Sequence, residues 1–300
     1  MKGMDRVGRG TPPARVDRPR RPSNHRHPVP SSVAAACLAL ALAACACAAL
    51  PARGHYALVN GIRIYYEIHG RGRPLLLLHG GAGDGRQFSN QVPAFSKSFR
   101  VIVPDERAQG RSADGPGPLT YHGMAEDVVA LLDHLGIRRA DVMGWSDGGI
   151  IGLDLAIHHP ERIDHLVTFG ANFHPAGLKS DDREWLSGAN AESFGPGSRS
   201  EYEKLSPDPG HWETAMNKIL AMWRTQPRFA LEQLHSIRAR TLIAAGDRDL
   251  VQPAHTDSLA RAIPGARLWI VPDASHGAML ERPELVNRTV LAFLDDRTLP

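Results

Sequence analysis

Short apolar runs recur along the chain and constrain its fold more than any other feature. Turn-forming or polar residues bound each run, a pattern typical of strands buried on both faces of a sheet. Six runs have this pattern: 75–78, 101–103, 141–143, 166–169, 241–245 and 267–271. Segments with helical spacing lie among and after them, at 124–135, 150–158 and 283–294. Strands that alternate with helices predict an α/β protein with a mostly parallel, doubly wound sheet. A hairpin at 56–68, which turns at Asn60-Gly61, is expected to precede it.

One segment interrupts the alternation of strands and helices. Residues 179–235 contain Trp185, Trp212 and Trp223, with Met216 and Met222 at helical distances. We expect a helical cap over the sheet; the alternative is that these aromatic side chains only form the core of the insertion itself, and both can hold because a cap needs a core. With 300 residues, of which 42% are hydrophobic, the chain can bury the core of one large domain. The expected organisation is a leader at 1–52, a core at 53–178 and 236–300, and a cap at 179–235.

Basic residues are concentrated at the start of the chain. The first 32 residues hold eight basic and two acidic side chains, so the other 268 residues hold 27 basic and 30 acidic ones. A folded part with a slight acidic excess offers no electrostatic case for binding nucleic acid. We therefore expect no nucleic-acid partner.

An uncharged run of 18 residues, 33–50, follows the basic segment and ends in small residues. This order is typical of a secretory signal peptide, and an Arg-rich start also suits an organelle transit peptide. A membrane-spanning helix is the competing interpretation, although the run is at the short limit for spanning. Within it, Leu42-Ala43-Ala44-Cys45 resembles the lipobox of bacterial lipoproteins, or arises by chance from the Ala-rich composition. We expect an exported or membrane-anchored protein that contacts the membrane only through this leader. A cytoplasmic location is the alternative if the leader is a misassigned start.

All three cysteines, Cys37, Cys45 and Cys47, lie in that run. The rest of the chain therefore has no disulfide framework, thiolate zinc site, iron–sulfur cluster or cysteine nucleophile. Histidine, aspartate and glutamate residues show no convincing metal-ligand spacing either. We expect no metal and no cofactor.

The motif Gly144-Trp145-Ser146-Asp147-Gly148 follows a predicted strand and opens a helix. In that context a sharp turn strains the serine and projects its hydroxyl, and the two glycines leave room for the crossing chain. Ser146 is therefore the candidate nucleophile, rather than an idle serine in a structural Gly-rich turn. Trp145 and Asp147, which flank it, are candidate substrate-binding residues.

A serine hydroxyl needs a base to remove its proton. Asp247 and Asp249 follow the fifth predicted strand, and His276 follows the sixth. The carboxyl ends of parallel strands meet at one edge of a sheet, so we expect these side chains at the edge that carries Ser146. His276 is the candidate general base, and either aspartate is able to orient it.

The loop His79-Gly80-Gly81-Ala82-Gly83 follows the first apolar run. Its glycines let backbone N–H groups approach a ligand closely. The N–H groups of Gly81 and Asp147 are the candidate oxyanion hole. The loop lacks the G-x-G-x-x-G spacing and the lysine of a P-loop, which argues against nucleotide binding.

Taken in order along residues 55–300, these motifs resemble the α/β-hydrolase superfamily, in its serine hydrolase branch. The resemblance implies an α/β-hydrolase fold with a helical cap and a Ser-His-Asp triad. Its acid motif, G-x-x-D-x-x-x-P, matches Gly246, Asp249 and Pro253, which favours Asp249 over Asp247. The motifs that carry the resemblance are His79-Gly80-Gly81, Asp105-Glu106-Arg107 with Gly110-Arg111-Ser112, the turn at Ser146, and Ser275-His276 with Glu281-Arg282-Pro283.

Residues 144–149, with Gly170-Ala171-Asn172 later in the chain, are similar to the valacyclovirase (biphenyl hydrolase-like) family. In that family the aspartate after the nucleophile anchors the α-amino group of an amino-acid ester. The resemblance implies this role for Asp147; the alternative is that Asp147 lends only its backbone N–H. Residues 179–235 show no close match to that family, so the resemblance leaves the substrate open.

The sequence thus predicts a serine hydrolase that cleaves a small carboxylic ester, thioester, lactone or amide through an acyl-enzyme. One alternative keeps the scaffold and changes the chemistry, to carbon–carbon bond hydrolysis or cofactor-free perhydrolysis. Another is a hydrolase-like ligand-binding protein with little turnover. Dehalogenase and epoxide hydrolase chemistry is disfavoured, because those relatives use an aspartate where this chain has Ser146.

Overall fold

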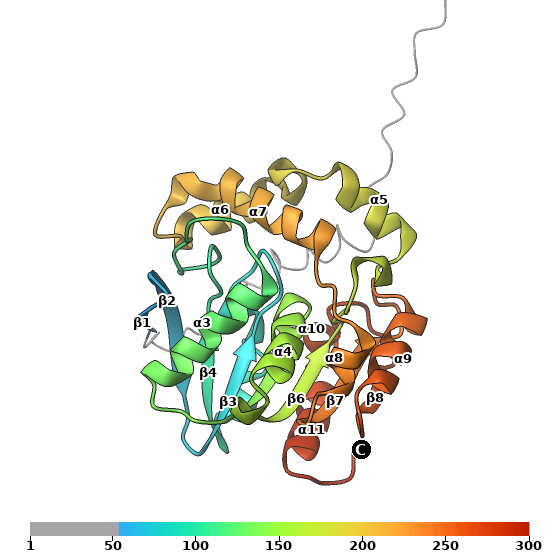
Figure 1. The fold of residues 1–300 in the computed structure, drawn as a ribbon. Helices are drawn as coiled ribbons and strands as arrows, with labels where there is room; N and C mark the ends of the chain where they lie inside the picture. Colours follow the sequence, from blue (N-terminus) through green and yellow to red (C-terminus); the bar gives the residue numbers. More distant parts are fainter. Residues whose placement is uncertain (1–53, 300) are drawn as a thin grey trace, which may run out of the picture.

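The computed structural model describes residues 54–299, so the predicted leader lies outside the described residues. This part of the chain forms an eight-stranded sheet with the order β1-β2-β4-β3-β5-β6-β7-β8 (Figure 1). Strand β2 is antiparallel to β1 and β4, and the other neighbouring pairs are parallel. The prediction of a mostly parallel α/β sheet is therefore confirmed. The strands are β1 (Gly54–Val59), β2 (Ile62–His69), β3 (Arg73–Leu78), β4 (Phe99–Pro104), β5 (Ala140–Trp145), β6 (Ile163–Phe169), β7 (Arg240–Gly246) and β8 (Arg267–Val271).

Strand β3 shows why the apolar runs become central strands. Successive side chains of a strand point to opposite faces of the sheet. Leu75 and Leu77 accordingly join the core on one face, and Leu76 and Leu78 join the core on the other. All four side chains are fully buried. Only a sheet covered by helices on both faces gives such a run a favourable place.

Helices cover both faces of the sheet. On one face lie α3 (Tyr121–His134), α4 (Asp147–His158), α8 (Leu231–His235) and α9 (Pro253–Ala262). On the other lie the short helices η1 (Gly85–Phe88), α2 (Val92–Phe95) and α10 (Ala278–Glu281), with α11 (Pro283–Leu294). Helix α3 packs along α4, which in turn contacts β5 and β6. The turn that begins α4 is therefore held from several sides.

A further group of helices lies across the end of the sheet at which β3 and β6 finish (Figure 1). The side chain of Phe194 contacts three tryptophans, Trp185, Trp212 and Trp223, at ring-centroid distances of 6.4, 5.9 and 5.9 Å. These aromatic residues pack against one another and belong to the same buried apolar cluster as the side chains on one face of the sheet. The group comprises α5 (Ser180–Gly188), η4 (Ala191–Phe194), α6 (Gly195–Leu205), η5 (Pro209–His211) and α7 (Trp212–Thr225), and η2 (Pro160–Arg162) and η3 (Pro175–Gly177) lie before it in the chain.

Strand β8 differs from the sequence prediction. The pattern predicts a strand buried on both faces, whereas β8 is the edge strand next to β7 and is largely exposed. Leu268 and Ile270 keep 41% and 42% of their surface exposed. An apolar run alone does not distinguish an edge strand from a central one, because the covering helices decide its burial.

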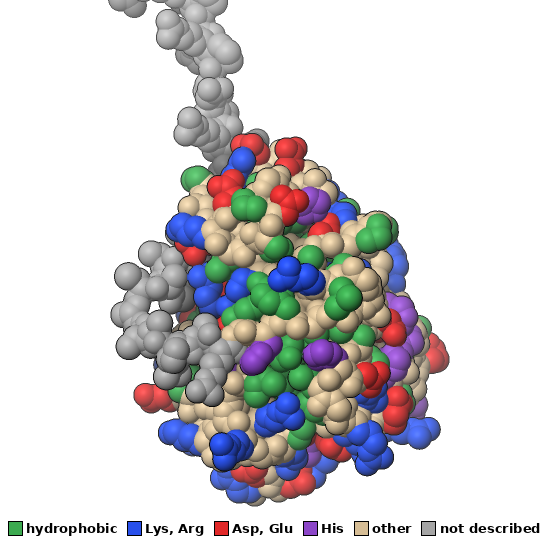
Figure 2. Space-filling view, turned by 90° about the vertical axis from the view of Figure 1, so that its left-hand side faces the viewer, with side chains coloured by type: hydrophobic (Ala, Val, Ile, Leu, Met, Phe, Trp, Pro, Cys, Tyr) green, Lys and Arg blue, Asp and Glu red, His purple; other side chains and the backbone are tan. Residues whose placement is uncertain are grey.

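The surface carries charges of both signs. Lysine and arginine side chains are interspersed with aspartate and glutamate side chains on the face that Figure 2 shows. Among residues 54–299, no helix combines the length and the apolar character that crossing a membrane requires.

Candidate active site

A cavity opens at the carboxyl edge of the sheet, beneath α5 and α7. Its empty volume is about 810 Å³, including solvent at its mouth. Five of the six predicted site residues line it: Gly81, Trp145, Ser146, Asp147 and His276. The other residues around it are Gly80, Gln87, Tyr121, Gly170, Asn172, Leu178, Asp182, Trp185, Leu186, Trp223, Gln226 and Leu250. Segments that are far apart in the sequence therefore meet at one small space.

Ser146 occupies the turn between β5 and α4. Its backbone has φ 53° and ψ −116°, which is strained for a residue with a side chain. A Cβ on Gly148 would overlap the backbone carbonyl of Leu78, and a Cβ on Gly144 would overlap the backbone of Gly148. The Ser146 N–H donates to the carbonyl oxygen of Phe169 at 2.7 Å. The glycines and this hydrogen bond hold the strained turn in place.

Asp249 and His276 form a buried pair beside the cavity. The Asp249 carboxylate accepts a hydrogen bond from His276 Nδ1 at 2.8 Å and one from the Val251 N–H at 3.0 Å. Both residues are at least nine-tenths buried. Because Nδ1 is bound to Asp249, His276 Nε2 is the ring nitrogen left to act on a ligand.

The pKa shifts of the pair follow from burial and charge. Burial opposes ionisation of Asp249, but the His276 charge and hydrogen bond, helped by backbone N–H groups, hold the pKa of Asp249 below its usual range. Burial also opposes the imidazolium. The charge and hydrogen bond of Asp249, with the charges of Asp147 and Asp182, nevertheless raise the pKa of His276.

The other aspartate after β7 has a different role. Asp247 is exposed and accepts hydrogen bonds from the backbone N–H groups of Asp273 and Ala274, at 2.9 and 3.1 Å. Asp247 therefore holds the loop that leads to His276 in place. Of the two aspartates, Asp249 is the one that contacts the imidazole. Trp145 fixes the same loop from the other side, because its Nε1–H donates to the His276 carbonyl oxygen at 2.7 Å.

Of Ser146, His276 and Asp249, only Ser146 has no hydrogen bond to another of the three. Ser146 is partly exposed and lines the cavity with His276. Within residues 54–299 its hydroxyl forms no hydrogen bond to the imidazole. Such bonds are often long before substrate binds and tighten only in the complex.

Two backbone N–H groups remain free at the cavity. The amides on either side of Gly81 are engaged, since Gly80 N–H donates to Gln87 Oε1 at 2.8 Å and Ala82 N–H donates to Gln109 Oε1 at 2.6 Å. In the described part of the chain, the N–H groups of Gly81 and Asp147 have no such partner. They are thus available to an oxygen atom of a ligand.

His79 anchors the loop that carries Gly81. Its Nδ1 donates to the Gly80 carbonyl oxygen at 2.8 Å, and its Nε2 accepts from the Glu106 N–H at 3.0 Å. The His79 side chain, buried with the Glu106 side chain against it, ties this loop to the end of β4.

The Asp147 carboxylate also reaches the cavity. It accepts a hydrogen bond from the Tyr121 hydroxyl at 2.8 Å and one from Trp223 Nε1 at 2.7 Å. Burial raises the pKa of Asp147, against the hydrogen bonds from Trp223 and Tyr121. Each carboxylate oxygen accepts one of these bonds, and each retains a further lone pair.

Sequence reasoning missed Tyr121, Trp223 and Asp182 as cavity residues. Tyr121 begins a helix whose spacing signals only burial, and the other two lie in the helices over the sheet. Their side chains meet the cavity through packing between distant segments, which no motif records. Trp185 contacts Phe194 as well, and it also lines the cavity.

Similar proteins place the chain in a known family. A family model of the alpha/beta hydrolase fold matches residues 73–194. RutD of Caulobacter sp. (strain K31), to which a carbamate hydrolase activity is ascribed, is 32% identical over 269 residues, covering 77% of this chain and 95% of RutD. The serine hydrolase BPHL of Mus musculus is 28% identical over 249 residues, covering 79% of this chain and 84% of BPHL.

A solved structure shows the same likeness. The enol-lactonase from Burkholderia xenovorans LB400 matches with a TM-score of 0.65 at 26% identity, covering 80% of this chain and 100% of the lactonase. The chain therefore belongs to the α/β-hydrolase family and is a hydrolase, which confirms the resemblance drawn from its motifs.

Substituting Gly148 tests the turn. We expect Gly148→Ala to destabilise the protein by about 1–3 kcal/mol, because the added methyl group forces backbone apart in a tightly packed region. The measurement is the free energy of unfolding in urea. Gly188→Ala is the matched control, since a Cβ there meets nothing within 4 Å, and it should change stability by less than about 0.5 kcal/mol. Equal stability of the two variants would contradict the tight packing.

Proposed function

We propose that this protein is a serine hydrolase that cleaves a small carboxylic ester, thioester, lactone or amide through an acyl-enzyme. The observation that carries the proposal is the buried Asp249–His276 pair, whose imidazole lines the same cavity as the strained Ser146 turn. A serine is activated in this way when a base takes its proton and an acid orients the base.

Acylation follows from these positions. Ser146 Oγ attacks the substrate carbonyl carbon while His276 Nε2 takes the hydroxyl proton. The bond to the leaving group then breaks, and the same proton passes from His276 to the leaving oxygen or nitrogen. Asp249 keeps the imidazole in the tautomer that presents Nε2 and stabilises the imidazolium that forms in between.

Deacylation repeats the sequence with water. His276 removes a proton from a water molecule, whose oxygen attacks the acyl carbon. The acyl–oxygen bond to Ser146 breaks, and the proton returns to the serine. In both halves the carbonyl oxygen becomes an oxyanion, and the free N–H groups of Gly81 and Asp147 are available to stabilise it. One such donor typically contributes about 10²–10³ in rate.

The cavity favours a small substrate that is neutral or positively charged. Apolar side chains of Leu178, Trp185 and Leu250 contribute to its wall. The buried carboxylates of Asp147 and Asp182 lie on it as well, whereas no lysine or arginine of residues 54–299 lines it. The carbamate and lactone chemistry in the names of two similar proteins supports a small carbonyl substrate.

An α-amino ester fits this electrostatic balance best. The remaining lone pairs of Asp147 can accept hydrogen bonds from an ammonium group beside the reacting carbonyl. The resemblance of residues 144–149 to the valacyclovirase family implies the same role. We therefore include α-amino-acid esters among the proposed substrates, with Asp147 as the amine anchor.

The nucleophile is tested by Ser146→Ala. We expect turnover of p-nitrophenyl acetate to fall by at least about 10³-fold, because the oxyanion hole alone leaves only residual catalysis. Circular dichroism and the thermal midpoint of the variant show whether the fold is intact. Unchanged turnover in a folded variant would refute the proposal.

The raised pKa of His276 sets the pH dependence. The imidazole acts as a base only when neutral, so kcat/KM for a neutral ester should rise with pH through a midpoint above about 6.5, the ordinary histidine value. Asp249→Asn removes the carboxylate, so it should lower that midpoint and reduce kcat by about 10⁴-fold.

The matched control for this pH profile is Asp247→Asn. It changes an aspartate of the same loop that has no contact with the imidazole, and kcat should stay within about tenfold of the unmodified protein. A midpoint below 6.5 in the unmodified protein, or equal losses in the two variants, would contradict the assignment of Asp249.

The amine anchor is tested with matched substrates. An α-amino-acid ester and its analogue without the amino group are compared by kcat/KM. We expect at least a tenfold preference for the amino ester, since a charge-assisted hydrogen bond is typically worth about 1.5–3 kcal/mol, and we expect Asp147→Asn to abolish it. Equal use of both esters by the unmodified protein would reject the anchor while leaving the hydrolase proposal standing.

A further inference from the structure

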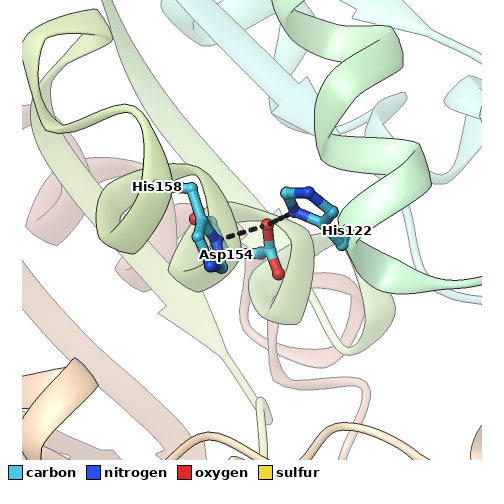
Figure 3. A group of neighbouring side chains, drawn as sticks. All are labelled: His122, Asp154 and His158. Atoms are coloured by element: carbon cyan, nitrogen blue, oxygen red, sulfur yellow. Dashed lines mark hydrogen bonds and ion pairs between the residues drawn. The ribbon is translucent and has the colours of Figure 1, made fainter.

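A second cluster of chemically active side chains lies outside the cavity, between two helices. His122 lies in the first turn of α3, and Asp154 and His158 lie one turn apart on α4 (Figure 3). Residues four apart on a helix share one face, so α4 presents both side chains toward α3. His122 and Asp154 are separated by 32 residues in the sequence, which is why no short motif reveals the cluster.

Both imidazoles approach the same carboxylate oxygen of Asp154. Asp154 Oδ1 is 2.9 Å from His122 Nδ1 and 3.0 Å from His158 Nδ1 (Figure 3). One potential ligand atom from each residue lies within 4.8 Å of those of the other two. The Asp154 side chain is buried, and the two imidazoles are partly exposed, at 55% and 37%. The cluster thus combines a fixed carboxylate with two imidazoles that solvent can reach.

We propose that His122, Asp154 and His158 form a binding site for a divalent transition-metal ion of the zinc class. Two imidazole nitrogens and one carboxylate oxygen are a ligand set that such ions prefer, whereas Mg²⁺ and Ca²⁺ prefer oxygen ligands. Bonds of about 2.0–2.2 Å to the ion need donor atoms closer together than 4.8 Å. Small rotations of the exposed imidazoles supply that approach, and water completes the coordination.

A neighbouring carboxylate supports this use of His122. Glu126 lies one turn further along α3, and its Oε1 is 3.8 Å from His122 Nε2 and 2.6 Å from His159 Nε2. A histidine that binds a metal through one ring nitrogen commonly has a carboxylate at the other, which orients the ring. Nδ1 of His122 faces Asp154 while Nε2 lies 3.8 Å from Glu126, so a small rotation of the His122 ring would bring this carboxylate into hydrogen-bond range.

The ion would join two helices that begin at the cavity. Helix α3 starts at Tyr121, whose hydroxyl binds Asp147, and α4 starts directly after Ser146. A ligand that binds only the folded state stabilises it by mass action. We therefore expect the bound ion to clamp α3 to α4 and to raise the thermal midpoint. This inference does not depend on the proposed catalytic function.

The test measures zinc binding by the full chain. Its three cysteines all lie at positions 37–47, so they are alkylated first to remove competing thiolates, and the protein is then stripped with a chelator. Bound Zn²⁺ is measured by equilibrium dialysis and metal analysis, and the thermal midpoint is measured with and without Zn²⁺. The variants are His122→Ala, His158→Ala and the double variant. His69→Ala is the matched control, because His69 contacts the carboxylate of Glu67 at 3.0 Å without a second imidazole.

We expect the unmodified protein and His69→Ala to bind one more Zn²⁺ per chain than the double variant. At a free Zn²⁺ concentration of 100 times Kd, their thermal midpoints should rise by about 5 °C more than that of the double variant. Each single variant should bind Zn²⁺ at least tenfold more weakly than the unmodified protein. Circular dichroism and the zinc-free thermal midpoint establish that the variants are folded. Equal zinc stoichiometry and equal thermal shifts in the unmodified protein and the folded double variant would overturn the proposal.

Discussion

The strained backbone turn at Ser146 is the constraint on which the candidate active site depends. Its positive φ persists because the glycines at 144 and 148 let three backbone segments pass at distances that a side chain would forbid. The turn also leaves the first N–H of α4, that of Asp147, without a hydrogen-bond partner among residues 54–299. The candidate nucleophile and one candidate oxyanion donor therefore come from one local geometry, which the buried strands on either side hold in place.

Electrostatic interactions also shape the candidate site. Asp249, His276 and Asp147 are all buried, so their mutual interactions are screened less than they would be in water. The carboxylates favour a charged imidazole, and burial opposes it. In the balance of these opposing effects, the pKa of His276 lies above its ordinary value. The indole of Trp145 donates a hydrogen bond to the His276 carbonyl oxygen, so the residue that precedes Ser146 also fixes the loop that carries His276.

Much of the fold and most of the cavity's reactive side chains were predictable from the sequence. The central strands are recognisable as apolar runs. Ser146 and His276 follow parallel strands, whose carboxyl ends lie at the same edge of the sheet. The edge position of β8 was not predictable, since its residues resemble those of a central strand. Residues placed by packing between distant helices, such as Tyr121, Asp182 and Trp223, carry no local signal. The sequence analysis did not find the His122–Asp154–His158 cluster, because spacing along a chain does not show which helices become neighbours.

Labelling with a fluorophosphonate followed by peptide mass spectrometry tests the central claim most directly. The reagent forms a stable bond only with a serine whose hydroxyl is activated by a neighbouring base. The convergence of Ser146 with the Asp249–His276 pair predicts one adduct per chain, on the peptide that contains Ser146, together with loss of ester turnover. A folded, ester-cleaving protein that carries no adduct at Ser146 would contradict it.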